Sequence, residues 1–158
     1  MQYTTYAKLT STQQKLVDEA EKVMKEAYNP YSHFYVGATL LAKDGSIISG
    51  ANVENAAYGS CICAERGALL RANAMGHRQF SSIAIITRGE TFDVKEPSAP
   101  CGSCRQMINE AAQLSEKNIE IILSNTKKDK VIITSIEELL PLSFGPRDLK
   151  MDIKKYQK

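Results

Sequence analysis

The chain has 158 residues, of which 43% are hydrophobic and 24% are charged, and its formal net charge is +2. This length suits one compact domain and is too short for two ordinary ones, so we expect a single domain over residues 1–158, with a core at about 11–149 and a lysine-rich tail at 150–158. The weak net charge argues against a nucleic-acid partner, and without an apolar run of about 18 residues we expect no membrane span.

The first third of the chain predicts a helix followed by a β-hairpin. Ser11 and Gln14 have the spacing of a capping box, and apolar residues then recur at helical spacing as far as Ala27. Two strands are expected next, at about 34–42 and 47–53, because an Asp-Gly turn joins two runs of strand-forming residues. The chain therefore begins with the order helix, strand, strand.

The rest of the chain alternates helices and strands. Residues favourable to helix predict one at 63–75, and the short apolar run at 83–87 is typical of a buried strand. After a loop we expect a helix at 102–114 and strands at 119–124 and 131–134. This order indicates the α/β class, with a three-layer α/β/α sandwich around a five-stranded mixed sheet.

Three cysteines and a glutamate have the spacing that a catalytic zinc ion requires. Cys63-Ala64-Glu65-Arg66 is followed at a distance by Pro100-Cys101-Gly102-Ser103-Cys104. Three thiolate ligands leave the fourth position of a tetrahedral Zn²⁺ open for water. An H-x-E element with P-C-x-x-C is the signature of zinc nucleobase deaminases, and an all-cysteine variant is known, with Cys63 here in the histidine position.

Glu65 is the candidate general acid and base. Hydrolytic removal of a ring amine needs a hydroxide-like nucleophile, which zinc supplies by lowering the pKa of water from about 15.7 to roughly 7. It also needs a group that returns protons, which Glu65 can supply. Two residues on a helix differ in direction by about 200°, so Glu65 and Cys63 can share a site only if the helix begins near Cys63. A helix start would also stabilise the thiolates of Cys63, Cys101 and Cys104.

Two arginines are candidates for balancing the charge of three thiolates. Arg66 follows Cys63 by three residues, and Arg105 follows Cys104 directly. A guanidinium that donates to a ligand sulfur would tune the metal. We interpret Arg66 in this way, although a surface arginine is the alternative, and for Arg105 both interpretations stay open.

A closed structural zinc site is the main alternative for the cluster. It would add Cys61 as a fourth ligand, but Cys61-x-Cys63 is tighter than the usual spacing and gives no reason for Glu65. We expect Cys61 to be a small buried residue beside the site. His33 and His77 are not needed as ligands.

The chain start and the cysteines also bear on the compartment. Residues 1–15 lack the basic start and apolar stretch of a signal peptide, so we expect a cytoplasmic protein. In that compartment a C-x-x-C element is more typical of metal binding or redox chemistry than of a disulfide. Thioredoxin-like redox chemistry would need neither Cys63 nor Glu65.

With these motifs placed, the chain resembles the small cytidine deaminases of the cytidine and deoxycytidylate deaminase superfamily over most of its length. The matching stretches are 29–38 (NPYSHFYVGA), 52–58 (NVENAAY), 63–66 (CAER), 100–106 (PCGSCRQ), 138–141 (ELLP) and 144–146 (FGP). The resemblance implies a cytidine deaminase-like fold and one zinc ion in each subunit, held by the three cysteines at 63, 101 and 104.

The resemblance also implies roles for residues around the zinc site. Glu65 would move protons to ring N3 and to the leaving amine, and the Ala64 N–H would help to hold the base. Asn52 and Glu54 would hydrogen-bond the ribose 3′-hydroxyl, which fits two side chains on the same face of a strand. Phe34 would pack on the pyrimidine. Taken alone, Asn52 and Glu54 would also suit a strand-end turn, and Phe34 a core position.

The small members of this family assemble as homotetramers with shared active sites. This implies that Tyr58 and Phe144 lie at subunit contacts, with Phe144 reaching over a partner's substrate. The chain departs from the family pattern in a longer stretch, Arg88–Ser98, and in the tail after Leu149. Either departure bears on pocket closure or assembly.

The implied activity is zinc-dependent deamination of cytidine and 2′-deoxycytidine to uridine and 2′-deoxyuridine, with release of ammonia, in pyrimidine salvage. The nearest alternative is the same chemistry on a cytosine-like antibiotic, as in blasticidin S deaminases, against which Glu54 argues for a ribose. Polynucleotide editing is disfavoured by the weak charge. A catalytically silent zinc-binding subunit is the alternative from a different class.

Overall fold

A mixed β-sheet forms the centre of the structure, a computed structural model in which residues 1–157 are described. Its six strands lie in the order β1-β6-β5-β4-β2-β3, and the β4–β5 pair is parallel while the other neighbours are antiparallel. The strands span Gln2–Thr4 (β1), Phe34–Ala42 (β2), Ile47–Ala51 (β3), Phe80–Gly89 (β4), Glu120–Ser124 (β5) and Val131–Ser135 (β6).

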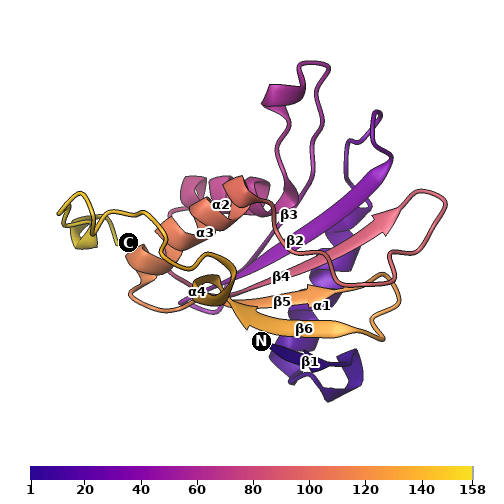
Figure 1. The fold of residues 1–158 in the computed structure, drawn as a ribbon, viewed down its shortest axis with the longest axis horizontal. Helices are drawn as coiled ribbons and strands as arrows, with labels where there is room; N and C mark the ends of the chain where they lie inside the picture. Colours follow the sequence, from indigo (N-terminus) through magenta and orange to yellow (C-terminus); the bar gives the residue numbers. More distant parts are fainter. Residues whose placement is uncertain (158) are drawn as a thin grey trace.

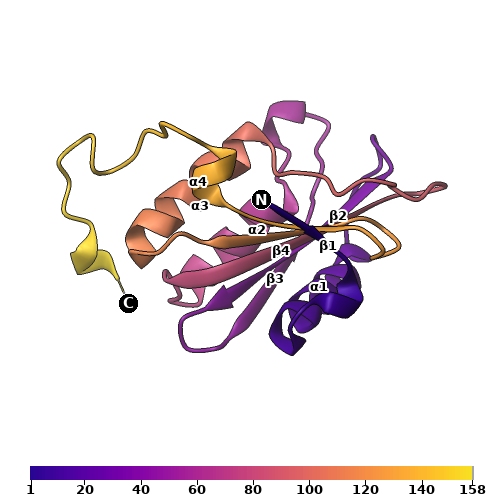
Figure 2. The same cartoon turned by 60° about the horizontal axis from the view of Figure 1, so that its bottom comes forward.

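Helices cover both faces of this sheet (Figures 1 and 2). One face carries α1, and the other carries α2 and α3 with the short α4 beside them. The helices span Ser11–Met24 (α1), Ala64–Ala74 (α2), Gly102–Ser115 (α3) and Ile136–Leu139 (α4), with 3₁₀ turns at Tyr6–Lys8, Tyr58–Ser60 and Lys154–Tyr156. The predicted three-layer α/β/α architecture is therefore confirmed.

The strand β4 shows why its sequence is continuously apolar. Ile83 and Ile85 belong to the core cluster under α2 and α3, whereas Ala84 and Ile86 belong to the cluster under α1. A strand covered on both faces needs apolar residues at successive positions rather than alternation. The run was therefore correctly interpreted as a buried strand, although β4 is longer than predicted and spans Phe80–Gly89.

The sheet has six strands and not the predicted five. The additional strand is β1, which pairs antiparallel with β6, with Thr4 opposite Val131. β1 has three residues, none of them buried, so its sequence carries no pattern of alternating burial. It forms because the edge of β6 offers unpaired backbone groups. The sequence of residues 2–4 alone therefore does not predict this strand.

Several predicted boundaries of the first elements were also wrong. The capping box of α1 is formed by Thr10 and Gln13, one residue before the predicted pair, and it is reciprocal. The helix ends at Met24 rather than at Ala27. β3 ends at Ala51, because the next residue, Asn52, uses its side chain to pair with the backbone of β2.

Helix α2 lies unusually close to the hairpin, and a glycine makes this possible. A Cβ atom at Gly50 on β3 would lie 2.5 Å from the Ala68 nitrogen and 2.7 Å from the Ala64 oxygen, both backbone atoms of α2. Only a residue without a side chain fits there. This contact sets the position of the α2 N-terminus, where the candidate site lies.

Among residues 1–157, no helix has the length and apolar character that a membrane span requires.

Candidate metal centre and active site

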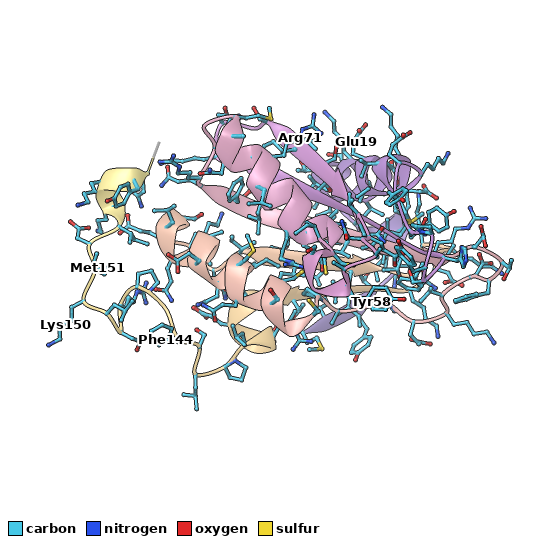
Figure 3. The ribbon with its side chains drawn as sticks, turned by 90° about the horizontal axis from the view of Figure 1, so that it is seen from above. Glu19, Tyr58, Arg71, Phe144, Lys150 and Met151 are labelled. Carbon is cyan, nitrogen blue, oxygen red and sulfur yellow. The ribbon has the colours of Figure 1, made fainter. Side chains whose placement is uncertain are left out.

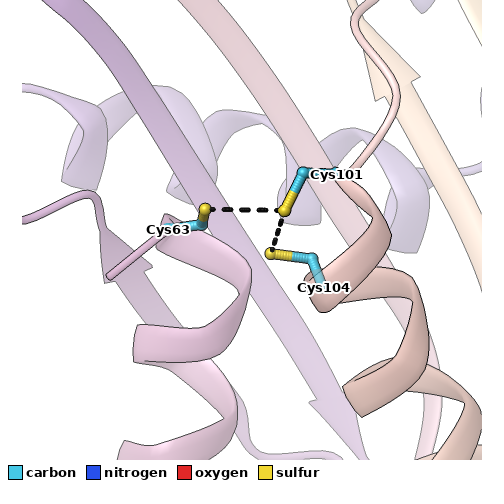
Figure 4. Close-up of side chains that lie close together, drawn as sticks. All are labelled: Cys63, Cys101 and Cys104. Carbon is cyan, nitrogen blue, oxygen red and sulfur yellow. Dashed lines mark hydrogen bonds between the residues drawn. The ribbon is translucent and has the colours of Figure 1, made fainter. Parts of the chain in front are cut away.

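Three cysteine thiols converge between the N-termini of α2 and α3 (Figure 4). Cys63 is the N-cap of α2, Cys101 is the N-cap of α3, and Cys104 lies in the first turn of α3. The Sγ atom of Cys101 lies 3.8 Å from that of Cys63 and 3.5 Å from that of Cys104. All three sulfurs lie within 4.8 Å of one another.

This spacing fits a tetrahedral zinc ion. A Zn–S distance of about 2.3 Å places two sulfurs of a tetrahedron about 3.8 Å apart, which agrees with the observed separations. Cys61 is not part of the cluster, and its Sγ atom accepts a hydrogen bond from the Asn55 N–H at 3.3 Å. The cluster therefore suits one Zn²⁺ with three thiolate ligands, and the closed four-cysteine alternative is not what the chain forms.

The charge of the thiols is distributed unevenly. Hydrogen bonding from the Cys104 thiol and from the Arg66 guanidinium lowers the pKa of Cys63 to about 5. The same contact with Cys63, together with burial, raises the pKa of Cys104. Arg66 places Nη2 at 3.8 Å from the Cys63 sulfur and at 2.7 Å from the Cys61 carbonyl oxygen, which it also binds. In the metal-free protein, one thiolate thus forms readily and Cys104 keeps its proton.

Glu65 lies in the first turn of α2 and is only 4% exposed. Burial raises the pKa of its carboxyl group, and the negative charge on Cys63 raises it further. A carboxyl group with a raised pKa can exchange a proton near neutral pH, as a general acid and base must.

A cavity of about 480 Å³ opens next to the sulfur cluster. Its walls include Phe34 and Val36 from β2, Ile85 from β4, and the side chains of Cys63 and Glu65 at the metal end. A largely apolar cavity of this size with a few polar groups is typical of a site for a small organic molecule.

Family comparison agrees with this geometry. Residues 10–117 match the family model described as "Cytidine and deoxycytidylate deaminase zinc-binding region", a match that includes all three clustered cysteines. The chain belongs to the cytidine and deoxycytidylate deaminase family.

Individual members of this family are similar over most of the chain. A cytidine deaminase of Halalkalibacterium halodurans is 45% identical over 86% of this chain and 96% of its own length. One from Sporosarcina psychrophila is 41% identical over 86% of this chain and 93% of its own. The crystal structure of cytidine deaminase from Burkholderia pseudomallei, 41% identical, superposes with a TM-score of 0.74 over 86% of this chain and all of that one.

The two side chains that are predicted to contact the ribose, Asn52 and Glu54, also form hydrogen bonds within the chain. The Asn52 side chain accepts a hydrogen bond from the Val36 N–H and donates one to the Phe34 carbonyl, both at 2.9 Å. A Glu54 carboxylate oxygen accepts hydrogen bonds from two successive backbone N–H groups, those of Tyr31 at 2.9 Å and Ser32 at 3.2 Å. Both side chains also line the cavity, so each has a second face available to a ligand.

Hydrogen bonding by Ser32, including that of its backbone N–H, lowers the pKa of Glu54. The carboxylate is therefore negatively charged at neutral pH. It can accept hydrogen bonds from hydroxyl groups of a ligand but cannot donate one.

The predicted aromatic contacts lie outside the chain's own cavity. Tyr58 is 72% exposed and Phe144 is 59% exposed, and they lie on separate parts of the molecule (Figure 3). The Tyr58 ring meets the ring of Tyr31 edge-on, with centroids 5.6 Å apart. The carbonyl of Phe144 accepts hydrogen bonds from Gln106 and Asn109, which fixes the backbone and leaves the ring free.

Arg105 and Ala64 occupy defined positions near the cluster. Arg105 donates from Nε to the Pro100 carbonyl at 2.8 Å and from Nη1 to the Leu139 carbonyl at 2.9 Å. Its guanidinium thus braces the loop before Cys101 through backbone carbonyls. Ala64 is the first residue of α2, where N–H groups have no partner within the helix.

Sequence reasoning did not single out every residue of the cavity. Thr87 and Ser98 also line it, and their hydroxyl oxygens are 3.1 Å apart. Thr87 follows Ile85 by two positions on β4, so a period of two would have placed both on one face. Ser98 lies in a loop, and no local pattern predicts that it returns to the cavity.

Proposed function

We propose that this chain converts cytidine and 2′-deoxycytidine to the corresponding uridine nucleosides with release of ammonia, serving pyrimidine salvage. The observation that carries the proposal is the buried Glu65 carboxyl group beside the three-thiol cluster, at one end of a cavity of about 480 Å³. The relatives named as cytidine deaminases match along most of the chain, which supports the same choice of substrate.

The residues of the site divide the work of the reaction. When bound by Cys63, Cys101 and Cys104, zinc supplies a water molecule of lowered pKa as nucleophile. Glu65 takes one proton from the nucleophile and gives it to ring N3, then takes a second proton from the hydroxyl group formed at C4 and gives it to the departing amine. Because Glu65 is buried, its proton does not exchange freely with bulk water during turnover. Arg66 offsets part of the negative charge of the thiolates.

The cavity walls hold the nucleoside in position. The Phe34 ring packs on the pyrimidine, and the first N–H groups of α2, including that of Ala64, hold the base. Asn52 and the anionic Glu54 bind the ribose 3′-hydroxyl with the sides that are not occupied by the backbone. The negative charge of Glu54 at the sugar end of the cavity disfavours a second negative charge on the ligand, so we expect nucleosides to be favoured over nucleotides.

We also propose a homotetramer in which neighbours complete each site. Phe144 and Tyr58 support this proposal, because both rings are largely exposed and neither contacts its own chain's cavity. An exposed aromatic ring on a fixed backbone is typical of a subunit contact.

The four free thiols agree with a location in the reducing cytoplasm.

The decisive experiment is to follow the ultraviolet absorbance of cytidine after addition of zinc-loaded protein. Deoxycytidine, cytosine, CMP, dCMP and blasticidin S are assayed in parallel. We expect turnover of the two nucleosides and little of the free base or the nucleotides. Turnover of blasticidin S alone would retain the zinc chemistry and overturn the substrate, and no ammonia from any of them would indicate a silent zinc protein.

A further inference from the structure

The loop between β4 and α3 includes most of the stretch in which this chain departs from the family pattern. It is fastened along its length to the turn between β5 and β6 (Figure 1). The Val94 N–H donates to the Thr126 hydroxyl at 2.9 Å, and the Thr126 N–H donates to the Val94 carbonyl at 3.3 Å. The Asn125 side chain donates to the Lys95 carbonyl at 3.0 Å. The loop is therefore held at the end of the sheet, and its return path is defined.

This return path brings Ser98 back to the cavity, opposite a hydroxyl group of β4. The Ser98 and Thr87 hydroxyl oxygens are 3.1 Å apart, both residues line the cavity, and Thr87 is only 3% exposed. Thr87 pairs directly with Val36 on β2, and Phe34 lies two residues from Val36. Because side chains on a strand alternate, Thr87, Val36 and Phe34 share the face of the sheet that carries the cavity.

The hydrogen-bonding capacity of this pair is not exhausted. Each hydroxyl group has one hydrogen to donate and two lone pairs, and the contact between them uses a single hydrogen. Within residues 1–157, neither hydroxyl oxygen has another hydrogen-bond partner. One hydroxyl hydrogen therefore remains for a ligand, in surroundings where an unpaired donor is unfavourable.

The cavity-lining residues that adjoin this pair on the sheet and in the loop cannot donate a hydrogen bond from a side chain. Val36, Ile85 and Ala99 are apolar, and the Glu54 carboxylate accepts hydrogen bonds only. We propose that Thr87 and Ser98 act as a unit that donates one hydrogen bond to an acceptor oxygen of the bound nucleoside. The Arg88–Ser98 stretch thereby contributes to substrate recognition. This inference rests on the proposed nucleoside deaminase function.

Three single variants of the zinc-loaded protein test the proposal by their kcat and KM for cytidine. Thr87→Val removes the hydroxyl group and keeps the branched shape, so we expect KM to rise about three- to tenfold, the equivalent of one hydrogen bond, with kcat within about twofold. Thr87→Ser keeps the hydroxyl group and should restore KM to near the wild-type value. Thr126→Val is the matched control, because it removes the hydroxyl group that binds the Val94 N–H and the Thr87 carbonyl and keeps both hydroxyl groups of the Thr87–Ser98 pair.

The outcomes separate a binding role from a structural one. If Thr87→Val and Thr126→Val raise KM equally, or if Thr87→Val lowers only the melting temperature, the pair merely fastens the loop and the proposal is wrong. A Thr87→Val/Ser98→Ala double variant should have a KM no higher than that of the more affected of Thr87→Val and Ser98→Ala measured singly, since the two hydroxyl groups act as a unit. Absence of turnover by the wild-type chain would instead contradict the proposed function itself, and this inference with it.

Discussion

Glu65 is a carboxyl group in an environment that opposes its negative charge. It is almost fully buried, and the charge of Cys63 raises its pKa more than the charge of Arg66 lowers it. The proposed chemistry needs this arrangement, because a carboxyl group with an ordinary pKa would hold its proton too weakly to return it to the substrate. The same residue should therefore be important for activity and unfavourable for stability.

The first prediction concerns activity. Glu65→Gln keeps the shape of the side chain and removes its proton transfer, so we expect kcat for cytidine to fall by at least about 10²–10⁴-fold while zinc content stays at one per chain. Steady-state kinetics and metal analysis check this. Glu110→Gln is a suitable control, because Glu110 is exposed on α3. Near-normal turnover by the Glu65 variant would remove it from the chemistry.

The second prediction concerns the stability of metal-free protein. Burial raises the pKa of Glu65 in the folded state above its value in the unfolded state. The contribution of Glu65 to the free energy of unfolding is therefore most favourable below the unfolded pKa, and it is lost as the pH rises through the folded pKa. In the Glu65→Gln variant this contribution does not change with pH, because glutamine does not titrate. We expect the metal-free variant to melt above wild type at pH 7–8 and the difference to shrink near pH 4. Equal melting temperatures at both pH values would contradict the raised pKa.

At the scale of elements, the site is a junction between two helix N-termini that belong to different parts of the chain. Cys63 begins α2, while Cys101 and Cys104 lie at the start of α3. A zinc ion held by these three cysteines would cross-link the two helices. The close contact of α2 with β3 at Gly50 places one of these N-termini.

The third prediction tests this link by metal removal. Chelation should lower the melting temperature, because metal binding stabilises the folded state only. Zinc should also be lost progressively on acidification, since the thiols must be deprotonated to bind and the pKa of Cys104 is raised. Differential scanning fluorimetry with and without chelator, and metal content across pH, check both. Cys101→Ala should lose zinc even at neutral pH, and a fully metallated, active variant would exclude Cys101 as a ligand.

The fourth prediction concerns the packing of α2. Gly50→Ala would place a methyl group against backbone atoms of α2 that cannot rotate away, so we expect destabilisation by about 1–3 kcal/mol and weaker zinc binding. Gly59→Ala is the matched control, since nothing lies within 4 Å of its added Cβ. Denaturant unfolding and zinc titration measure the two effects. If the two variants were equally stable, the close contact would not position α2.

At the scale of the whole molecule, the Phe144 ring is not part of the cavity that its own chain forms. The cavity opens beside α2 and α3, whereas Phe144 extends from the segment after α4 with its ring exposed (Figure 3). A single chain thus forms the metal centre and the cavity but not the aromatic cover that the family resemblance implies.

The fifth prediction therefore concerns assembly. Sedimentation should give the mass of four chains, and Phe144→Ala should raise KM for cytidine about tenfold or more while zinc content is unchanged. Leu142→Ala is the control for general loss of surface hydrophobicity, because Leu142 is a fully exposed apolar residue two positions before Phe144. A wild-type monomer that is fully active would overturn the shared site.

Much of the metal centre was predictable from the sequence because its determinants are local. The Cys63–Glu65 pair and the Cys101–Cys104 pair each lie within one helical turn, and their helix starts follow from neighbouring residues. The buried strand β4 and the three-layer architecture were also predictable, since apolar periodicity reports which faces are covered.

Only the tertiary structure decided the features that depend on segments distant in the chain. It showed that Cys61 lines the cavity and is only partly buried, not buried as predicted, that the edge of β6 recruits β1, and that Ser98 returns to meet Thr87. The backbone pairing of Asn52 likewise ends β3 earlier than its sequence suggests. Each is set by contact energies between remote residues, which leave no periodic signal in the segments that make them. The sequence by itself determined which groups form the candidate site, because their spacing is local, and long-range packing determined the shape of the cavity around them.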